Sequence, residues 1–129
     1  MMTEKTPAQK LLIKEGYSVL LINPPSDHES LLGEISGSSI YINKSPEKPD
    51  VIVAFLENRK DLESHLLEFK SLLKPKTLLW LSYHKGTSKI KTDINRDTIN
   101  AYCMTKGLQG IAMISINDDW SSLRVKLSE

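Results

Sequence analysis

The chain has 129 residues, of which 40% are hydrophobic and 26% are charged. This composition is typical of one globular domain and differs from that of a disordered tail or a membrane protein. Lys and Arg number 17 and Asp and Glu number 16, so the formal charge of +1 argues against a dedicated nucleic-acid-binding protein. A single cysteine and three separated histidines predict neither a disulfide framework nor a metal site.

The start of the chain carries no pattern of a targeting segment. The first ten residues are polar and include a proline, whereas a secretory signal needs a longer apolar run. The longest apolar runs span five or six residues, as in Val51–Leu56, and a membrane span needs about 20. We therefore expect a cytoplasmic protein in which residues 1–129 form one domain.

In the first half of the chain, turn-forming residues separate short apolar segments. Thr6-Pro7 is typical of a helix start and Gly16 of a helix end. The apolar run Tyr17–Ile22 indicates a strand buried on both faces, which ends at Asn23 because two prolines follow. The predicted elements here are helices over 6–16 and 27–35 and strands over 17–22 and 39–43.

The second half alternates clear strands with two helices. Leu62, Leu66, Phe69 and Leu73 form one narrow apolar stripe at helical spacing. The predicted strands span 50–56, 77–83, 111–116 and 123–127, and the predicted helices span 58–74 and 95–107. The last two strands are joined by Asn117–Ser122, a link short enough to indicate an antiparallel hairpin.

Buried strands that alternate with helices predict an α/β fold, namely a three-layer, Rossmann-like, doubly wound and mostly parallel sheet of about six strands. One link conflicts with a uniform parallel sheet. Lys44–Pro49 is too short to hold a crossover helix, so the second strand is expected to be short, skewed or antiparallel.

The segment LLKPKTLLWLSYHK follows a predicted strand and helix and precedes a helix and a hairpin. This arrangement resembles the second half of class I methyltransferases, which have a seven-stranded sheet with a terminal antiparallel hairpin. Applied to the six strands predicted here, the resemblance implies the strand order 2-1-3-4-6-5.

The chain is also similar to an uncharacterised bacterial family known only as a domain of unknown function. Its patterns are K-L-G-I-x-x-G-x-x-V, D-x-V-x-x-F, L-W-x-S-x-x-K, D-x-x-x-D, G-L and D-x-x-W-S-G-L-R. The matching residues, between about Gln9 and Val125, are Lys10-Leu11, Gly16, Asp50 to Phe55, Leu79-Trp80, Ser82, Lys85, Asp93, Asp97, Gly107-Leu108, Asp118, Trp120-Ser121 and Leu123-Arg124. His84, Asn100 and Ser122 stand where Pro, Arg and Gly are usual, and the family supplies no activity to transfer.

The resemblance to methyltransferases implies a site for S-adenosylmethionine, which those enzymes hold with a glycine-rich turn after the first strand and an acidic residue ending the second. Here the turn is Asn23-Pro24-Pro25-Ser26-Asp27, and Asn43 stands nearest to the acidic position. Proline removes backbone donors and asparagine lacks the charge, so no cofactor is expected. The turn is also similar to the N-P-P-aromatic motif of amino-methyltransferases, but a serine cannot stack on a base.

Ligands of open α/β sheets bind beyond the carboxyl ends of the strands, where the strand order reverses. With the implied order, that crevice lies between the first and third strands. Its candidate residues are Asn23, Ser26, Glu57 and Asn58. The helix that follows could bind an anion at its N-terminus, although the favoured interpretation is that Asp27 caps it.

Five further candidates follow the later strands. His84 could move protons and Lys85 could hold an anion, while Asp93 could pair with Lys85 or cap a helix. Trp120 is either a stacking platform or a plug folded over the core, the favoured alternative. In the second case we expect Arg124 to pair with an aspartate, either Asp118 or Asp97.

Two functions of different classes stay open. The favoured one is a non-catalytic Rossmann-like module that binds a protein partner or a small anionic ligand. The alternative is a small-molecule enzyme, methyltransferase-like or nucleotide-using, that works at the carboxyl edge of the sheet. Nucleic-acid binding rests only on the lysines of 85–91 and is disfavoured, and no membrane association is expected. A homo-oligomer stays open because Leu67 lies off the apolar stripe.

Overall fold

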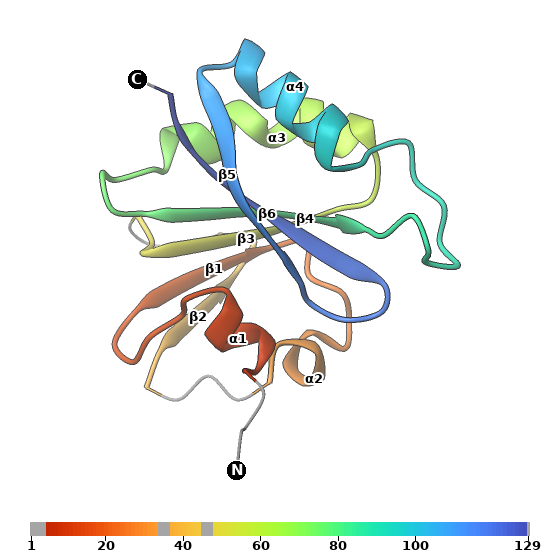
Figure 1. Ribbon diagram of the computed structural model, residues 1–129. Coiled ribbons are helices and arrows are strands. Elements are labelled where there is room, and N and C mark those ends of the chain that lie inside the picture. The colour runs from red at the N-terminus through yellow and green to blue at the C-terminus, as the bar shows by residue number, and fades with distance from the viewer. Residues whose placement is uncertain (1–4, 34–36, 45–47, 129) are drawn as a thin grey trace.

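A six-stranded sheet forms the centre of the molecule, with helices on both of its faces (Figure 1). The computed structural model describes residues 5–33, 37–44 and 48–128. In chain order its elements are α1 (Pro7–Lys10), β1 (Ser18–Ile22), α2 (His28–Leu32), β2 (Ser39–Ile42), β3 (Val51–Leu56), α3 (Arg59–Ser71), β4 (Leu78–His84), α4 (Arg96–Thr105), β5 (Leu108–Ser115) and β6 (Trp120–Leu127).

The strand order is β2-β1-β3-β4-β6-β5, which confirms the predicted order. Strands β2, β1, β3 and β4 are parallel to their neighbours, whereas β6 pairs in antiparallel fashion with both β4 and β5. The predicted α/β class, mostly parallel sheet and terminal hairpin are therefore correct. Of the alternatives for the second strand, short is correct and antiparallel is wrong, because the four residues of β2 run parallel to β1.

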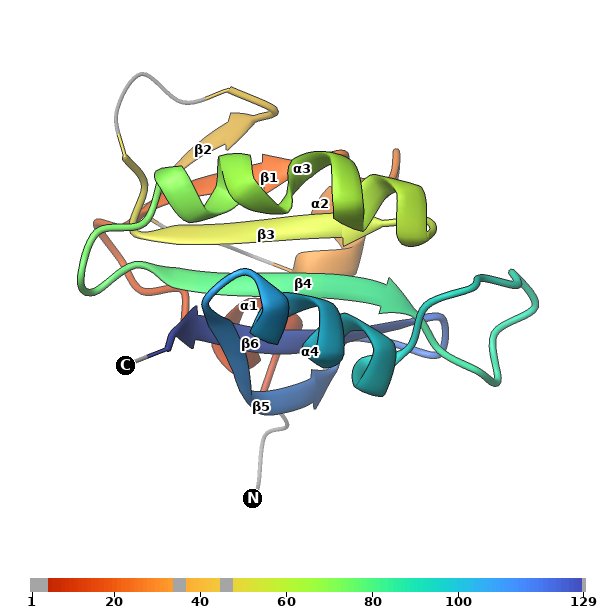
Figure 2. The ribbon, with the colours of Figure 1, turned by 90° about the horizontal axis from the view of Figure 1, so that it is seen from above.

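Unequal layers cover the two faces of the sheet: Figure 1 shows α3 and α4 on one side and α1 and α2 on the other, and Figure 2 looks down on the face that α3 and α4 cover. On one face α3 buries the predicted stripe, including Leu62, Leu66 and Phe69, and α4 adds its own buried residues to the same core. On the other face α1 and α2 have only four and five residues. There Trp80 fills the interior, and its indole N–H donates to the carbonyl of Leu11 at 3.0 Å.

Several helices are shorter than predicted. The helix predicted over 6–16 covers only Pro7–Lys10, and the helix predicted to 74 ends at Ser71. The second predicted helix covers His28–Leu32, and its predicted end at Ile35 lies outside the described residues. No helix among the residues that the structure describes is long and apolar enough to cross a bilayer.

The terminal hairpin is longer and its loop shorter than predicted. Both strands have eight residues, and β6 starts at Trp120, three residues before the predicted start. Ser121 and Ser122 lie opposite Tyr83 and Ser82 in the pairing with β4. The hydroxyl of buried Ser82 donates to that of Ser122 at 2.9 Å, so two serines occupy a central strand position without an unpaired hydroxyl.

Asp50 stabilises the start of β3 and gives the fold an acid-sensitive contact. Its carboxylate accepts from the Ser18 amide at 2.9 Å, and Lys74 Nζ lies 3.4 Å away. These contacts, the Ser18 amide first, lower the pKa of Asp50 below its ordinary value of 3.8. A lowered folded pKa adds stability above the unfolded pKa, and this stability is lost as the pH falls through the folded value.

We therefore expect wild type to exceed Asp50→Asn in free energy of unfolding at pH 7, and the difference to shrink as the pH falls below 3.8. Urea denaturation at a series of pH values measures it. Asp118→Asn, at an exposed hairpin position, is the matched control. A difference that grows on acidification would contradict this account of Asp50.

Candidate functional site

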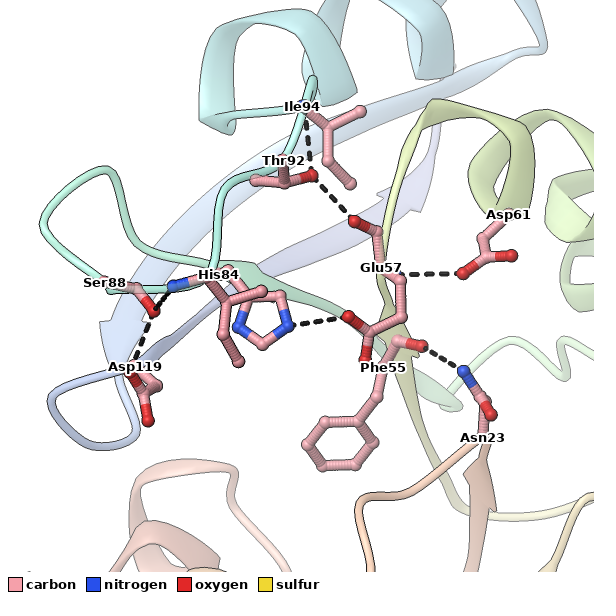
Figure 3. A network of polar contacts seen from close by, with 10 residues as sticks. Asn23, Phe55, Glu57, Asp61, His84, Ser88, Thr92, Ile94 and Asp119 are labelled. Atoms are coloured by element: carbon pink, nitrogen blue, oxygen red, sulfur yellow. Dashed lines mark hydrogen bonds and ion pairs between the residues drawn. The ribbon is translucent and has the colours of Figure 1, made fainter.

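The carboxyl ends of β1, β3 and β4 meet at one edge of the sheet, and each is followed by or ends in a polar side chain. Asn23 follows β1, Glu57 follows β3 and His84 ends β4. The register pairs Leu56 with Tyr83, so the next residues along these two parallel strands, Glu57 and His84, are neighbours. Figure 3 shows these side chains in one polar network.

His84 and Glu57 form a hydrogen-bonded pair. Nε2 of His84 lies 2.8 Å from the Glu57 carboxylate, and the His84 side chain is 2% exposed whereas the Glu57 side chain is 49% exposed. Donation from Nε2 to the carboxylate makes Nδ1 the unprotonated acceptor in the neutral ring. Nδ1 is itself buried and has no hydrogen-bond partner among the described residues.

Aromatic rings enclose the imidazole on the face of the sheet that α1 and α2 cover. The His84 ring lies over Trp120 with 3.9 Å between the ring centroids, and Phe55 meets Trp120 edge-on at 5.1 Å. Trp120 is only 6% exposed. Of the two alternatives for Trp120, the structure therefore favours the plug over the core, because its ring packs against Phe55 and His84 instead of standing free.

A pocket of about 380 Å³ opens at the same edge, on the α3 side. It lies beyond the carboxyl ends of β1, β2 and β3, where the strand order reverses. Its lining residues are Ile22, Asn23, Asn43, Phe55, Leu56, Asp61, His65 and Glu68. We call it the strand-end pocket.

Two asparagines with left-handed backbones shape the pocket floor. Asn23 and Asn43, which follow β1 and β2, have φ values of 52° and 61°. Asparagine tolerates this conformation better than most residues. The Asn23 amide N–H donates to the Asn43 side-chain oxygen at 2.7 Å, and Asn23 Nδ2 donates to the Phe55 carbonyl at 3.3 Å. The turn that ends β1 is thus tied to both neighbouring strands.

The charge of the strand-end pocket is negative. Asp61 lies one turn before His65 on α3 and Glu68 one turn after it, and both line the pocket together with His65. No lysine or arginine is among the lining residues. One oxygen of Asp61 accepts the Glu57 amide N–H at 2.9 Å, and the Asn58 side chain accepts the Asp61 amide N–H. Neighbouring side chains therefore satisfy these two backbone amides at the start of α3. Such a lining suits a ligand that donates hydrogen bonds.

Two predicted candidates, Asn58 and Asp93, support the start of α3. Asn58 is the N-cap of α3, and Asp93 accepts the Arg59 amide N–H at 2.7 Å, so Asp93 supports α3 and does not pair with Lys85. Asp27 stands at the N-cap position of α2, but its side chain makes no cap hydrogen bond, so the expectation that it caps this helix is wrong. Ser26 beside it is exposed.

The candidates from the later strands do not converge. The Nζ of Lys85 donates to the hydroxyl of Ser115 at 2.6 Å, whereas the His84 imidazole pairs with Glu57. Arg124 is half-buried in β6, and the expected ion pair with Asp118 or Asp97 is not found in the described part of the chain. An acid–base group that combines His84, Lys85 and Asp93 is therefore not assembled in this conformation.

Sequence reasoning missed three lining residues of the pocket. Asp61, His65 and Glu68 recur at positions i, i+4 and i+7 and therefore share one face of α3. That spacing was visible in the sequence, but only the placement of α3 over β1 shows that this face borders the strand ends. Among the described residues, no group of His, Cys, Asp or Glu is placed to hold a metal ion.

Cys103 lies on the inner face of α4 and is fully buried. Burial raises the pKa of its thiol to about 12, since the charged thiolate is disfavoured away from water. The predicted interpretation of Cys103 as a small buried hydrophobic residue agrees with this environment.

No protein-family model and no curated protein matches the sequence. Solved structures do match the fold. A SAM-dependent methyltransferase from Aquifex aeolicus aligns with a TM-score of 0.68 and 14% identity, over 91% of this chain and 85% of that one. A SAM-dependent methyltransferase from Bacteroides fragilis, in complex with S-adenosyl-L-homocysteine, aligns with a TM-score of 0.65 and 12% identity, over 98% of this chain and 78% of that one. A protein in the NADB-Rossmann superfamily from Streptococcus agalactiae aligns with a TM-score of 0.61 and 10% identity, over 98% of this chain and 70% of that one.

This chain has a methyltransferase-like, Rossmann-like fold. Identities of 10% to 14% show the fold alone, so whether the protein shares the cofactor of these enzymes depends on its own residues. The turn after β1 contains Pro24 and Pro25, which have no N–H to donate, and it leads into an α2 of only five residues. At the end of β2, Asn43 directs its side-chain oxygen to Asn23. These residues do not fit S-adenosylmethionine in the manner of class I enzymes.

The His84–Glu57 contact predicts a graded response to substitution. Glu57→Ala leaves a buried imidazole N–H without an acceptor and is expected to lower the free energy of unfolding by about 1–3 kcal/mol. Glu57→Gln keeps an acceptor oxygen and should cost less. Urea denaturation measures both. Glu63→Ala removes a carboxylate of similar exposure from a surface pair with Arg59 and is the control. Equal effects of Glu57→Ala and Glu63→Ala would show that the contact with His84 is not stabilising.

Proposed function

We propose that the protein is a binding module on a methyltransferase-like frame, whose strand-end pocket takes a small ligand rich in hydroxyl or amino groups. The observation that carries the proposal is the lining of the pocket. Two carboxylates and two side-chain amides border a space of about 380 Å³ at the switch point of the sheet. Ligand pockets in proteins begin at about this size and prefer this position.

The lining also indicates which ligand chemistry suits the site. Carboxylates accept hydrogen bonds and attract cations, so hydroxyl and ammonium groups are matched and phosphate is repelled. The sequence favoured a module that binds a protein partner or a small anionic ligand. The negative lining by Asp61 and Glu68 supports a neutral or cationic ligand in this pocket instead.

The proposal includes binding and excludes methyl transfer, for two reasons. The turn after β1 lacks the backbone donors of the class I cofactor site, and the imidazole at the edge is buried. Membership of the uncharacterised bacterial family with the W-S-x-L-R ending belongs to this proposal too, and the binding of a protein partner through another surface is compatible with it.

A second candidate is an enzyme of small-molecule metabolism, and one specific contact favours it. A carboxylate that orients an imidazole through one nitrogen leaves the other nitrogen as an acid–base group. Glu57 and His84 have this arrangement, with Nδ1 unpartnered among the described residues. The two candidates differ in what removal of His84 does, because it would abolish turnover in the enzyme and leave binding in the strand-end pocket unchanged.

A thermal-shift and calorimetric series tests the proposed ligand class. The probes are adenosine, spermidine, S-adenosyl-L-homocysteine and inorganic phosphate. We expect a hydroxyl- or amine-bearing probe to raise Tm by several degrees at about 100 times its Kd, and phosphate to leave Tm unchanged. A shift with phosphate alone would contradict the proposed ligand class.

Substitutions on α3 place the binding event. Glu68→Gln should weaken binding of an amine-bearing probe about tenfold, because it removes a charge from the lining. Asp61→Asn keeps an oxygen for the Glu57 amide while it removes the second charge. Glu63→Gln, on the same helix and outside the lining, is the matched control. Equal affinities in all three variants would place the ligand elsewhere.

A further inference from the structure

The first part of the segment that joins β4 to α4, residues 85–92, buries little apolar surface. It projects beyond the end of the sheet in Figures 1 and 2. Between Gly86 and Lys91 only Ser88 is buried, and Ile90 is 49% exposed. A segment with little buried apolar surface opens at a small fraction of the cost of global unfolding. We call residues 85–92 the cover loop.

Polar anchors fix the cover loop at both ends. The Ser88 hydroxyl donates to the Asp119 carboxylate at 2.8 Å, and the Lys85 amide N–H donates to the Asp119 carbonyl at 2.7 Å. Further along, the Thr92 hydroxyl donates to the Glu57 carbonyl at 2.8 Å. Ser88 is thus the one side chain that ties the middle of the loop to the terminal hairpin.

In the view of Figure 3, the cover loop lies on the side of the His84 imidazole to which Nδ1 points. In Figure 3, Ser88 and Asp119 lie on the opposite side of the imidazole from Glu57, and Nδ1 points to that side. Nδ1 is shielded from solvent, and in the described part of the chain nothing donates to it. A buried acceptor without a donor is unfavourable. With the loop closed, Nδ1 lacks a hydrogen bond that water or a ligand could donate to it.

We propose that the cover loop opens as a unit when the Ser88–Asp119 hydrogen bond breaks, and that it then exposes a second binding site, in which His84 Nδ1 accepts a hydrogen bond from a hydroxyl or ammonium group. Glu57 holds the ring so that Nδ1 faces outward when the loop is open. Trp120 packs against one face of the imidazole and fixes the plane of the ring. The site is distinct from the strand-end pocket, whose lining does not include His84, and does not depend on the function proposed for that pocket.

Chemical footprinting of the full chain tests this opening. Diethyl pyrocarbonate is attacked by an accessible imidazole nitrogen, which forms an N–C bond as ethyl carbonate leaves and breaks down to ethanol and carbon dioxide. Mass spectrometry of peptides gives the rate at each histidine. His65, whose side chain is 48% exposed, is the internal reference. Alkylation of buried Cys103, normalised to the unfolded chain, reports global unfolding in the same samples.

We expect His84, relative to its rate in the unfolded chain, to react more slowly than His65 and faster than Cys103. Ser88→Ala should raise the His84 rate about tenfold, since it removes a hydrogen bond to a carboxylate, and should leave the His65 rate unchanged. Ser71→Ala, which removes an exposed hydroxyl from α3, is the matched control and should change neither rate. If His84 is protected as strongly as Cys103 in both wild type and Ser88→Ala, the loop opens only by global unfolding and the proposal is overturned.

The ligand class has its own measurement. Long-range proton–nitrogen NMR spectra resolve the two ring nitrogens of His84, and ethanolamine offers both a hydroxyl and an ammonium donor. We expect ethanolamine to shift the Nδ1 resonance at a lower concentration in Ser88→Ala than in wild type. A Nδ1 resonance that ethanolamine leaves unmoved in Ser88→Ala would overturn the assignment of this nitrogen as the binding atom.

Discussion

The parallel pairing of β3 with β4 is the constraint on which the rest of the structure depends. All six residues of β3 are buried, and each pairs with a residue of β4 from Val51–Leu78 to Leu56–Tyr83. A strand buried on both faces allows no slip, because a shift by one residue would exchange its two faces. This register brings Glu57 beside His84, so apolar burial in the centre of the sheet positions a polar pair at its edge.

The unequal covering of the two faces decides where the polar groups of that edge are accessible. On the α3 side, a full-length helix brings Asp61, His65 and Glu68 to the strand ends and leaves a pocket. On the other side α1 and α2 are short and contribute few side chains to the core. The buried rings of Trp80 and Trp120 occupy much of the space there. A tryptophan fills more space than any other side chain, so that face closes around His84 and leaves it to be uncovered by loop movement.

Much of the fold was predictable because apolar runs and helix-capping residues are local signals. Strands such as Val51–Leu56 and caps such as Asn95 were predicted within a residue or two, and the strand order came from the resemblance to methyltransferases. The hairpin was misjudged because Ser121 and Ser122 do not look like strand residues, and only their pairing with β4 satisfies them. The polar pair was missed because it needs the register, which links positions 27 residues apart.

A methyltransferase-like frame with this edge illustrates how far a fold constrains function. The frame fixes where the strands end and therefore where a ligand can approach. The chemistry at that place depends on a few side chains that the frame leaves free to vary. Asn23 and Asn43 tie β1 to its neighbours, and one polar atom of each side chain, Asn23 Nδ2 and Asn43 Oδ1, is engaged within the turn. The carboxylates on α3 then set the charge of the pocket, and this charge, more than the fold, decides which molecules can enter it.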